Sequence, residues 1–352
     1  MSKVLMKGNE AIAEAAIKAG CRHYFGYPIT PQTEIAAYMA KRMPKIGGTF
    51  LQAESEISAI NMVYGVAGAG FRVMTSSSSP GVSLKQEGIS YIAGADLPAL
   101  IVNVQRGGPG LGGIQPSQSD YFQATKGGGH GDYRLIVYAP ASVQEMADYT
   151  IKAFDVADKY RMPVMLLADG TMGQMMEPVE LPEAVVEEVE KPWAVRGTEC
   201  KRKHNIINSL YLNPEELERT NVERFEKYKV IEENECLYEE FMMDDAEYCV
   251  VAFGIASRIS KNAVIEARKQ GVKVGLIRPI TLWPFPTKVL RAAADKVKGF
   301  LSVELSMGQM IEDVRLATEC KKLVKLCSRT GGMIPSPEQV LESIINLSKE
   351  AK

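Results

Sequence analysis

Short apolar runs alternate with helical patterns through the first half of this 352-residue chain. The apolar runs are typical of strands and read, in chain order, RHYFGY, GTFLQA, FRVMTS, PALIVNVQ, YRLIVYAP and PVMLLAD. Strands separated by helices usually pair in parallel, and strands without a polar face need helices on both sides of their sheet. We therefore expect residues 1–185 to form a doubly wound α/β domain around a parallel sheet.

The polar and charged residues 186–245 break this alternation. Within them, Asn213 followed by Pro214 predicts the start of a solvent-exposed helix, with the asparagine as its cap. We interpret this stretch as a connecting segment; a partner-binding arm is the alternative. The alternation resumes from residue 246 to residue 352, where we expect a helix over 309–326. A second, smaller α/β domain is predicted there.

The composition excludes several classes of protein. A formal charge of −2 gives no basic field, which argues against a nucleic-acid partner. No apolar run approaches the roughly 20 residues that cross a bilayer, and the N-terminus has no signal-peptide core, so we expect no membrane and a cytoplasmic location. The six cysteines form no C-x-x-C pair and the three histidines are far apart. No metal site is therefore expected on this chain.

The stretch GYPITP, residues 26–31, is rigid because two prolines flank Ile-Thr. Pro28 is expected to end a strand, Pro31 to occupy the first position of a helix and Thr30 to cap that helix. Such a corner lies at the carboxyl end of a parallel sheet, where open α/β folds bind ligands. Free backbone donors there suit an anion. A capped helix without a ligand is the simpler alternative.

Two further strand ends carry charged side chains. QAESEISA, residues 52–59, places Glu54 and Glu56 at the start of a helix rich in small residues, with Ser55 as a candidate cap. We expect a carboxyl in such a closely packed place to be poorly solvated and to keep its proton. Arg106 ends the apolar strand PALIVNVQ. Thr30, Glu56 and Arg106 each follow a parallel strand, so we expect them to converge on one rim.

The loop GPGLGG, residues 108–113, matches the dinucleotide fingerprint G-x-G-x-x-G. The context argues against that function, because IQPSQSDYF follows in place of an apolar helix. We interpret the loop, which continues into TKGGGHGD, as mobile or substrate-covering. A dehydrogenase that binds NAD is the alternative that this motif alone supports.

Together, these motifs resemble those of the 2-oxoacid:ferredoxin oxidoreductases. The resemblance rests on YPITP, on the helix start S-E-x-x-A at residues 55–59, and on the apolar strand that ends in Arg-Gly-Gly-Pro. It is to the α-type subunit, which carries the pyrimidine-binding domain for thiamine diphosphate. GIASR, LIRPITLWPFP and VELSMGQM resemble that family's transketolase C-terminal-like domain. The glycine-rich loop most resembles the branched-chain, 2-oxoisovalerate type.

The resemblance implies a role for each candidate residue. Glu56 would hydrogen-bond the N1′ nitrogen of the cofactor's pyrimidine, and Tyr27 and Pro28 would contact the cofactor. Thr30 and Arg106 would hold the carboxylate of the substrate. The implied reaction is the oxidative decarboxylation of a 2-oxoacid, in which coenzyme A accepts the acyl group and ferredoxin accepts the electrons.

The chain lacks two parts of such an enzyme. It has no acidic motif for diphosphate and magnesium and no ferredoxin-type cysteine run. The resemblance therefore implies a hetero-oligomer, in which a β-type pyrophosphate-binding subunit, a γ-type subunit and a ferredoxin-like subunit supply magnesium and iron–sulfur clusters. Two alternatives stay open at this stage: a transketolase or 2-oxoacid dehydrogenase relative with another electron acceptor, and a non-catalytic assembly or regulatory module. The choice of 2-oxoacid also stays open.

Overall fold

The larger sheet has the strand order β12-β6-β7-β5-β4-β2-β3 in the computed structural model, which describes residues 3–183 and 189–351. All neighbours pair in parallel except β12, which runs antiparallel to β6 at one edge. The strands are β2 (His23–Gly26), β3 (Thr49–Gln52), β4 (Val73–Ser77), β5 (Ala99–Gln105), β6 (Ile136–Tyr138), β7 (Pro163–Asp169) and β12 (Thr281–Trp283).

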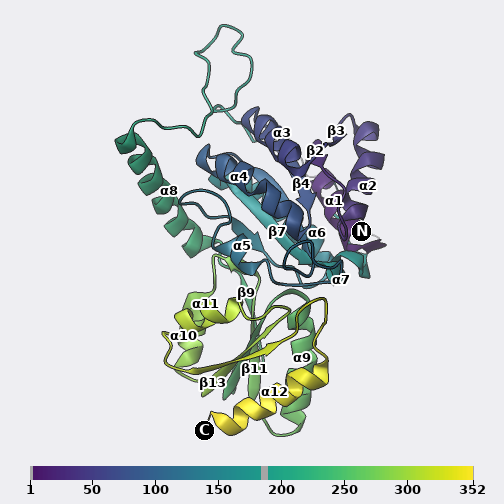
Figure 1. Cartoon of the computed structure of the whole chain (residues 1–352), viewed down its shortest axis with the longest axis vertical. Helices are drawn as coiled ribbons and strands as arrows, with labels where there is room; N and C mark the ends of the chain where they lie inside the picture. Colours follow the sequence, from purple (N-terminus) through teal and green to yellow (C-terminus); the bar gives the residue numbers. More distant parts are fainter. Residues whose placement is uncertain (1–2, 184–188, 352) are drawn as a thin grey trace.

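Helices cover both faces of this sheet, as expected for strands that are buried along their whole length, such as β5 and β7 (Figure 1). The helices α3 and α4 pack together on one face, and α1 and α6 pack together on the other. A two-stranded antiparallel ribbon of β1 and β8 lies beside α1 and α6. The bounds are α1 (Gly8–Lys18), α2 (Thr33–Arg42), η1 (Met43–Ile46), α3 (Glu56–Gly68), α4 (Ser79–Gly94), α5 (Tyr121–Thr125), α6 (Val143–Tyr160), α7 (Gly170–Gln174), β1 (Val4–Lys7) and β8 (Met176–Val179).

A second sheet, in the order β14-β13-β10-β11-β9, forms the core of the lower body in Figure 1. Its strands run parallel except β9, which is an antiparallel edge strand. The elements are β9 (Tyr238–Phe241), β10 (Tyr248–Ala252), β11 (Val274–Pro279), β13 (Gly299–Glu304), β14 (Leu323–Ser328), α9 (Gly254–Lys269), α10 (Thr287–Ala294), α11 (Met310–Ala317) and α12 (Pro337–Glu350). The predicted fold class, a doubly wound domain and a smaller α/β domain, is confirmed.

The prediction of one helix over residues 309–326 is wrong. Helix α11 ends at Ala317, and Leu323–Ser328 form strand β14 beside β13. The helix stops because Glu319 and Cys320 adopt left-handed backbone angles, with φ values of 53° and 54°. Two strands also depart from the predicted domain limits. Strand β9 lies within the connecting segment 186–245 but pairs in the second sheet, and β12, from the predicted second domain, extends the first sheet. The division of the chain at those limits stays a prediction.

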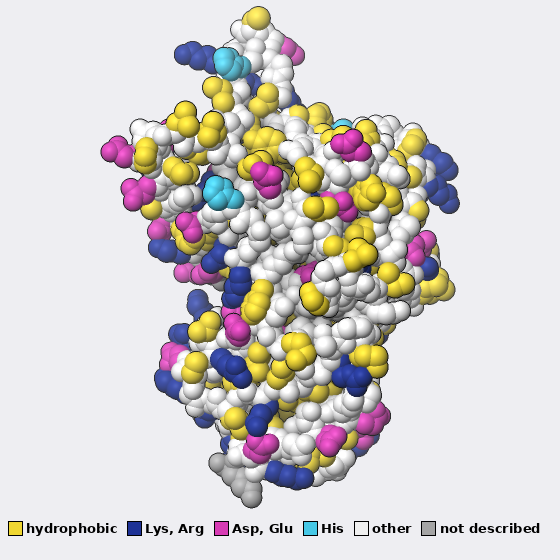
Figure 2. Space-filling view, in the orientation of Figure 1, with side chains coloured by type: hydrophobic (Ala, Val, Ile, Leu, Met, Phe, Trp, Pro, Cys, Tyr) yellow, Lys and Arg dark blue, Asp and Glu magenta, His cyan; other side chains and the backbone are white. Residues whose placement is uncertain are grey.

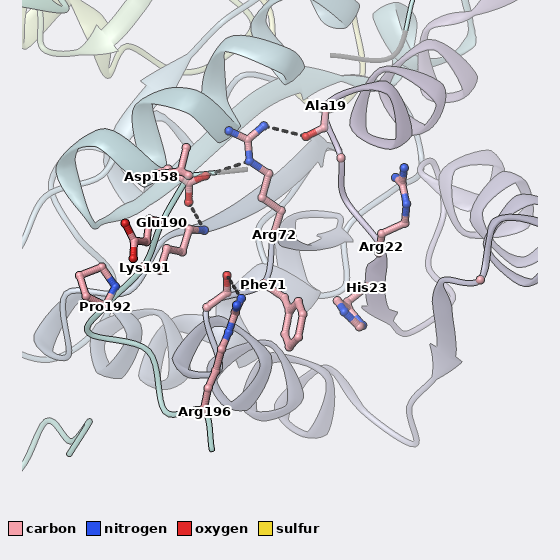
Figure 3. A pocket seen from close by; sticks show the side chains of 14 residues that line it. Ala19, Arg22, His23, Phe71, Arg72, Asp158, Glu190, Lys191, Pro192 and Arg196 are labelled. Carbon is pink, nitrogen blue, oxygen red and sulfur yellow. Dashed lines mark hydrogen bonds and ion pairs between the residues drawn. The ribbon is translucent and has the colours of Figure 1, made fainter. Parts of the chain in front are cut away.

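The connecting segment is held to the larger domain by buried charges. The Asp158 carboxylate, 4% exposed, accepts from Arg72 Nε at 2.8 Å and pairs with Lys191 of the segment (Figure 3). Helix α8 (Pro214–Asn234) follows the segment and begins as predicted, because Asn213 Oδ1 accepts the N–H of Glu215 at 2.9 Å. Most of α8 is exposed. No helix in the described part of the chain is long and apolar enough to cross a membrane.

The two bodies meet at the carboxyl end of β7. Gln118 Nε2 donates to the Phe253 carbonyl at 2.9 Å, and Gln118 Oε1 accepts the Leu305 N–H at 3.1 Å. Asp169 caps α7 by accepting backbone N–H groups of its first turn, and it also receives the N–H of Ile255 from the second body. Burial nevertheless raises the pKa of Asp169 from 3.8 to about 6.

We expect the substitution Asp169→Asn to remove part of the pH dependence of stability. Because the folded-state pKa is raised, the stability contributed by the neutral carboxyl is complete below about pH 4 and is lost as the pH rises through about 6. Relative to the unsubstituted protein, the variant should therefore become more stable by about 2–3 kcal/mol between pH 4 and pH 8. Urea unfolding midpoints measured across that range test this. Parallel pH profiles for the two proteins would contradict it.

Candidate active site

The loops that follow β2, β3, β4 and β5 meet at one edge, because these strands are parallel neighbours and their carboxyl ends point the same way. They enclose a pocket of about 480 Å³. The residues that line it are Tyr27, Pro28, Ile29, Thr30, Thr33, Glu56, Pro80, Gly81, Leu84, Arg106 and Leu111. The structure thus brings together all five residues for which the sequence predicted a role: Tyr27, Pro28, Thr30, Glu56 and Arg106.

The corner after β2 differs in one respect from the prediction. Helix α2 begins at Thr33, two residues later than expected, and Thr30 does not cap it. The helix starts later because two carbonyl groups bond to other elements. The Thr30 carbonyl accepts from Arg106 Nη1 at 2.9 Å, and the Pro31 carbonyl accepts from Asn9 Nδ2 at 2.8 Å. Thr30 is exposed on the pocket rim, together with Tyr27 and Pro28.

Glu56 is the buried acid of the pocket. Ser55 caps α3 as predicted, with its hydroxyl accepting the N–H of Ser58 at 3.2 Å, and this cap places Glu56 at the first helical position. Glu56 is only 6% exposed. No hydrogen bond or ion pair reaches its carboxyl from residues 3–183 and 189–351. Glu54 is exposed and accepts from the Ser58 hydroxyl at 3.0 Å, so the two glutamates lie in different environments.

Close approach of α4 confines the Glu56 carboxyl. A Cβ atom placed on Gly81, in the first turn of α4, would lie 2.5 Å from Glu56 Oε1 and 2.2 Å from Ser77 Oγ. A larger residue at this position would displace both oxygens. The Ser77 hydroxyl is buried and has no hydrogen-bond partner within the described chain. The confined region therefore contains two polar groups, on Glu56 and Ser77, without a protein partner.

Arg106 joins two of the loops. It is 7% exposed, and its Nη1 and Nη2 atoms donate to the carbonyl groups of Thr30 at 2.9 Å and Leu111 at 3.0 Å. These bonds use two of the five N–H groups of the guanidinium. The Nε atom is buried without a partner among the described residues. Arg106 thus fixes the shape of the pocket and keeps donors for an anion.

Sequence reasoning missed Lys85 in α4, which lies behind the pocket wall and is fully buried. Its Nζ donates to Thr75 Oγ1 at 2.6 Å and to the Ser76 carbonyl at 3.0 Å. Burial lowers the pKa of Lys85 to about 7, while the neighbouring Glu56 carboxylate acts in the opposite direction. In VSLKQEGISY the lysine resembles an ordinary surface residue of an amphipathic helix. No sequence signal distinguishes it.

The glycine-rich loop contributes Leu111 to the pocket, whereas Gly128 and Gly129 pack against α4. No long helix follows GPGLGG, because the next helix is the short α5, which begins at Tyr121. That geometry lacks the strand–turn–helix unit of a dinucleotide site. Within the described residues, no group of three or more metal-ligating side chains comes together, and the cysteines are free.

A larger pocket, of about 750 Å³, lies at the opposite edge of the sheet, beside Arg22, His23 and Arg72 (Figure 3). Its size alone does not make it the better candidate. Arg72 and Lys191 there are already paired with Asp158, and Arg22 Nη1 is bonded to backbone carbonyls. The smaller pocket, by contrast, is lined by Glu56, which has no hydrogen-bond or ion-pair partner among the described residues. An acid in a confined, mostly apolar site can hold a ring nitrogen by a hydrogen bond, and an adjacent arginine can bind a carboxylate.

Comparison with known proteins agrees with this geometry. Residues 14–240 match the family described as pyruvate flavodoxin/ferredoxin oxidoreductase, thiamine diphosphate-binding, and residues 246–340 match the pyruvate:ferredoxin oxidoreductase core domain II. The chain is 53% identical over its whole length to the ketoisovalerate oxidoreductase subunit VorB of Methanothermobacter marburgensis, of which it covers 99%. It is 37% identical to the 2-oxoglutarate synthase subunit KorA of Methanothermobacter thermautotrophicus, with 98% of each chain covered.

A solved structure shares the fold. The 2-oxoglutarate:ferredoxin oxidoreductase of Magnetococcus marinus superposes with a TM-score of 0.87 at 27% identity, covering 100% of this chain and 66% of that one. The family match spans more than half of the chain, and the similarity to VorB is continuous from end to end. The chain therefore belongs to the 2-oxoacid:ferredoxin oxidoreductases, as an α-type subunit with the thiamine diphosphate-binding fold.

Proposed function

We propose that this chain supplies the pyrimidine-binding half of a thiamine diphosphate site that oxidatively decarboxylates a branched-chain 2-oxoacid of the 2-oxoisovalerate type. Coenzyme A accepts the acyl group and ferredoxin accepts the electrons. The observation that carries the proposal is the Glu56 carboxyl, which is buried, confined by Gly81 and open to the pocket without a protein partner in the described chain.

Glu56 is suited to hold the ring nitrogen of the cofactor. The surrounding side chains are largely apolar, so a hydrogen bond made there is stronger than one made in water. Tyr27 and Pro28 line the mouth of the same pocket and provide flat surfaces for a ring. When bound, thiamine diphosphate supplies the electron sink for decarboxylation. The part of Glu56 is to orient the pyrimidine and to hold a proton at its ring nitrogen.

Arg106 and Thr30 are suited to hold the carboxylate of the substrate. The guanidinium keeps N–H groups beyond those donated to the carbonyls of Thr30 and Leu111, and the Thr30 side chain lies on the same rim. Ile29, Leu84 and Leu111 line the pocket beside them, and these apolar side chains suit an aliphatic chain on the substrate. The 53% identity to a ketoisovalerate oxidoreductase subunit supports the branched-chain class.

Partner subunits complete the site in this proposal. A β-type subunit holds the diphosphate and its metal, and γ-type and ferredoxin-like subunits hold the iron–sulfur clusters, since the described residues contain no acidic or cysteine cluster for either task. Large apolar side chains are exposed on or near the loops around the pocket: Leu51, Ile57, Leu84, Leu111 and Ile114. Figure 2 shows many apolar side chains on the face of the larger domain. Such surfaces commonly mark contacts between proteins.

We expect Glu56→Gln to reduce the turnover of the complex, reconstituted with its native partner subunits, by at least about 100-fold. The amide keeps the size of the side chain but has no carboxyl proton to share with a ring nitrogen. Glu54→Gln is the matched control: it makes the same chemical change two residues away, on an exposed side chain, and should leave turnover unchanged. The assay measures reduction of a viologen acceptor with 2-oxoisovalerate and coenzyme A. Full turnover in Glu56→Gln would refute the proposal.

Arg106→Lys should raise the KM for the 2-oxoacid by about 10- to 100-fold, because a charged hydrogen bond of about 1.5–3 kcal/mol is lost while the positive charge remains. The affinity for thiamine diphosphate should change much less. Steady-state kinetics and cofactor titration of the same preparation separate the two effects. Equal losses in both affinities would mean that Arg106 only holds the loops of Thr30 and Leu111 together.

A further inference from the structure

Arg106 is held at its backbone as well as at its guanidinium. It directly follows β5, and its backbone N–H donates to Ser79 Oγ at 3.0 Å. Ser79 is the first residue of α4, from which Pro80 and Leu84 line the candidate active site. One hydroxyl therefore connects the arginine to the helix that lines the same pocket.

A carboxylate orients the Ser79 hydroxyl. Ser79 Oγ donates to Asp120 Oδ2 at 2.5 Å, and the same oxygen accepts Asn103 Nδ2 of β5 at 2.9 Å. The backbone N–H of Asp120 donates to Gln105 Oε1 at 3.1 Å. A separation of 2.5 Å is typical of a hydroxyl that donates to an ionised carboxylate, and such bonds are stronger than those between neutral groups. Asp120 thus fixes the direction in which Ser79 Oγ presents its lone pairs to Arg106.

Removal of the carboxylate would free this hydroxyl to turn. The Arg106 carbonyl oxygen lies 3.2 Å from Ser79 Oγ and is a second acceptor within its reach. A hydroxyl has one proton and rotates to suit its acceptor. Donation to that carbonyl would redirect the lone pairs and weaken the bond from the Arg106 N–H. The backbone of Arg106 would then lose its fixed position, and the guanidinium would move with it.

The second body anchors the corner of the chain that carries Asp120. Gln309, directly before α11, donates from Nε2 to the Ser119 carbonyl at 2.7 Å and accepts the Phe122 N–H on Oε1 at 2.8 Å. One side-chain amide thus binds the backbone on both sides of Asp120. The corner is held by the smaller domain, while its carboxylate acts on the larger one.

We infer that Asp120 is a positioning residue for Arg106, which acts through the Ser79 hydroxyl and is itself anchored by Gln309. This inference rests on the proposed function, because it concerns the arginine assigned to the substrate carboxylate. A guanidinium is planar and presents its N–H groups in a rigid fork, so its orientation decides how well it binds a carboxylate. Asp120 does not line the pocket. It therefore contributes to the affinity for the 2-oxoacid without contacting it.

The test is steady-state kinetics of the complex reconstituted with its native partner subunits, with 2-oxoisovalerate varied and viologen reduction as the readout. Asp120→Ala should raise the KM for the 2-oxoacid by about 5- to 20-fold. It should change kcat by less than about twofold, since a contact that is equally strong in the ground state and the transition state affects KM alone. The affinity for thiamine diphosphate, titrated on the same preparation, should stay within about twofold.

Two further variants and a control accompany this measurement. Asp120→Asn keeps an acceptor oxygen for Ser79 and should return the KM to within about threefold of the original value. Gln309→Ala releases the corner but keeps the carboxylate, so it should raise the KM as well, and it serves as the second variant if Asp120→Ala impairs folding. Asp132→Ala removes an exposed carboxylate from the loop after α5 and should change neither KM nor kcat.

A double variant tests the path from Asp120 to the substrate. In the Arg106→Lys background, Asp120→Ala should raise the KM by no more than about a further twofold, because the guanidinium that it positions is absent. Two independent contributions would instead multiply.

The inference is overturned if Asp120→Ala and Gln309→Ala both leave the KM unchanged, or if Asp120→Ala keeps its full effect in the Arg106→Lys background. An equal loss of thiamine diphosphate affinity would also overturn it, because the carboxylate would then hold the start of α4 as a whole. Failure of the proposed function looks different: Arg106→Lys itself would keep the original KM, and both claims would fall. A raised KM in Arg106→Lys beside an unchanged KM in both corner variants would overturn the inference alone.

Discussion

The parallel order of β5, β4, β2 and β3 is the constraint on which the site depends. Parallel neighbours present their carboxyl ends at one edge, so residues as distant in sequence as Thr30 and Arg106 come within hydrogen-bond distance. The bond between them then stabilises the two loops against each other. The strand order thus determines where the pocket forms, and the side chains then stabilise its shape.

Close packing of α3 and α4 adds the second condition. Gly81 and Gly88 let the two helices approach, since a Cβ on Gly88 would lie 2.4 Å from Ile60. That approach leaves Glu56 only 6% exposed and buries Lys85 completely. Small residues in these helices thus determine how deeply the acid is buried.

Much of this arrangement is readable from the sequence. Each of Thr30, Glu56 and Arg106 follows an apolar strand, so their convergence follows from the parallel pairing alone. The start of α2 was not readable, because the carbonyl groups of Thr30 and Pro31 bond to side chains far away in the sequence. The pairing of β9, from the connecting segment, with the second sheet and of β12, from the second domain, with the first sheet was missed for a similar reason: strand partners at sheet edges are chosen by tertiary contacts. Lys85 was missed because helical periodicity does not reveal burial by a neighbouring helix.

The proposed division of the cofactor site between chains follows from what this chain offers. It provides a buried acid, an arginine with unused donors and apolar side chains around them, and its described residues bring together no group of three or more metal-ligating side chains. A diphosphate with its magnesium needs such a cluster. In the proposed arrangement, the ring-binding half of the site works only when a partner brings the other half, and the exposed apolar side chains around the pocket give that partner a surface to cover. The proposal thus couples assembly to cofactor binding, because the two subunits would bind opposite ends of the same cofactor molecule.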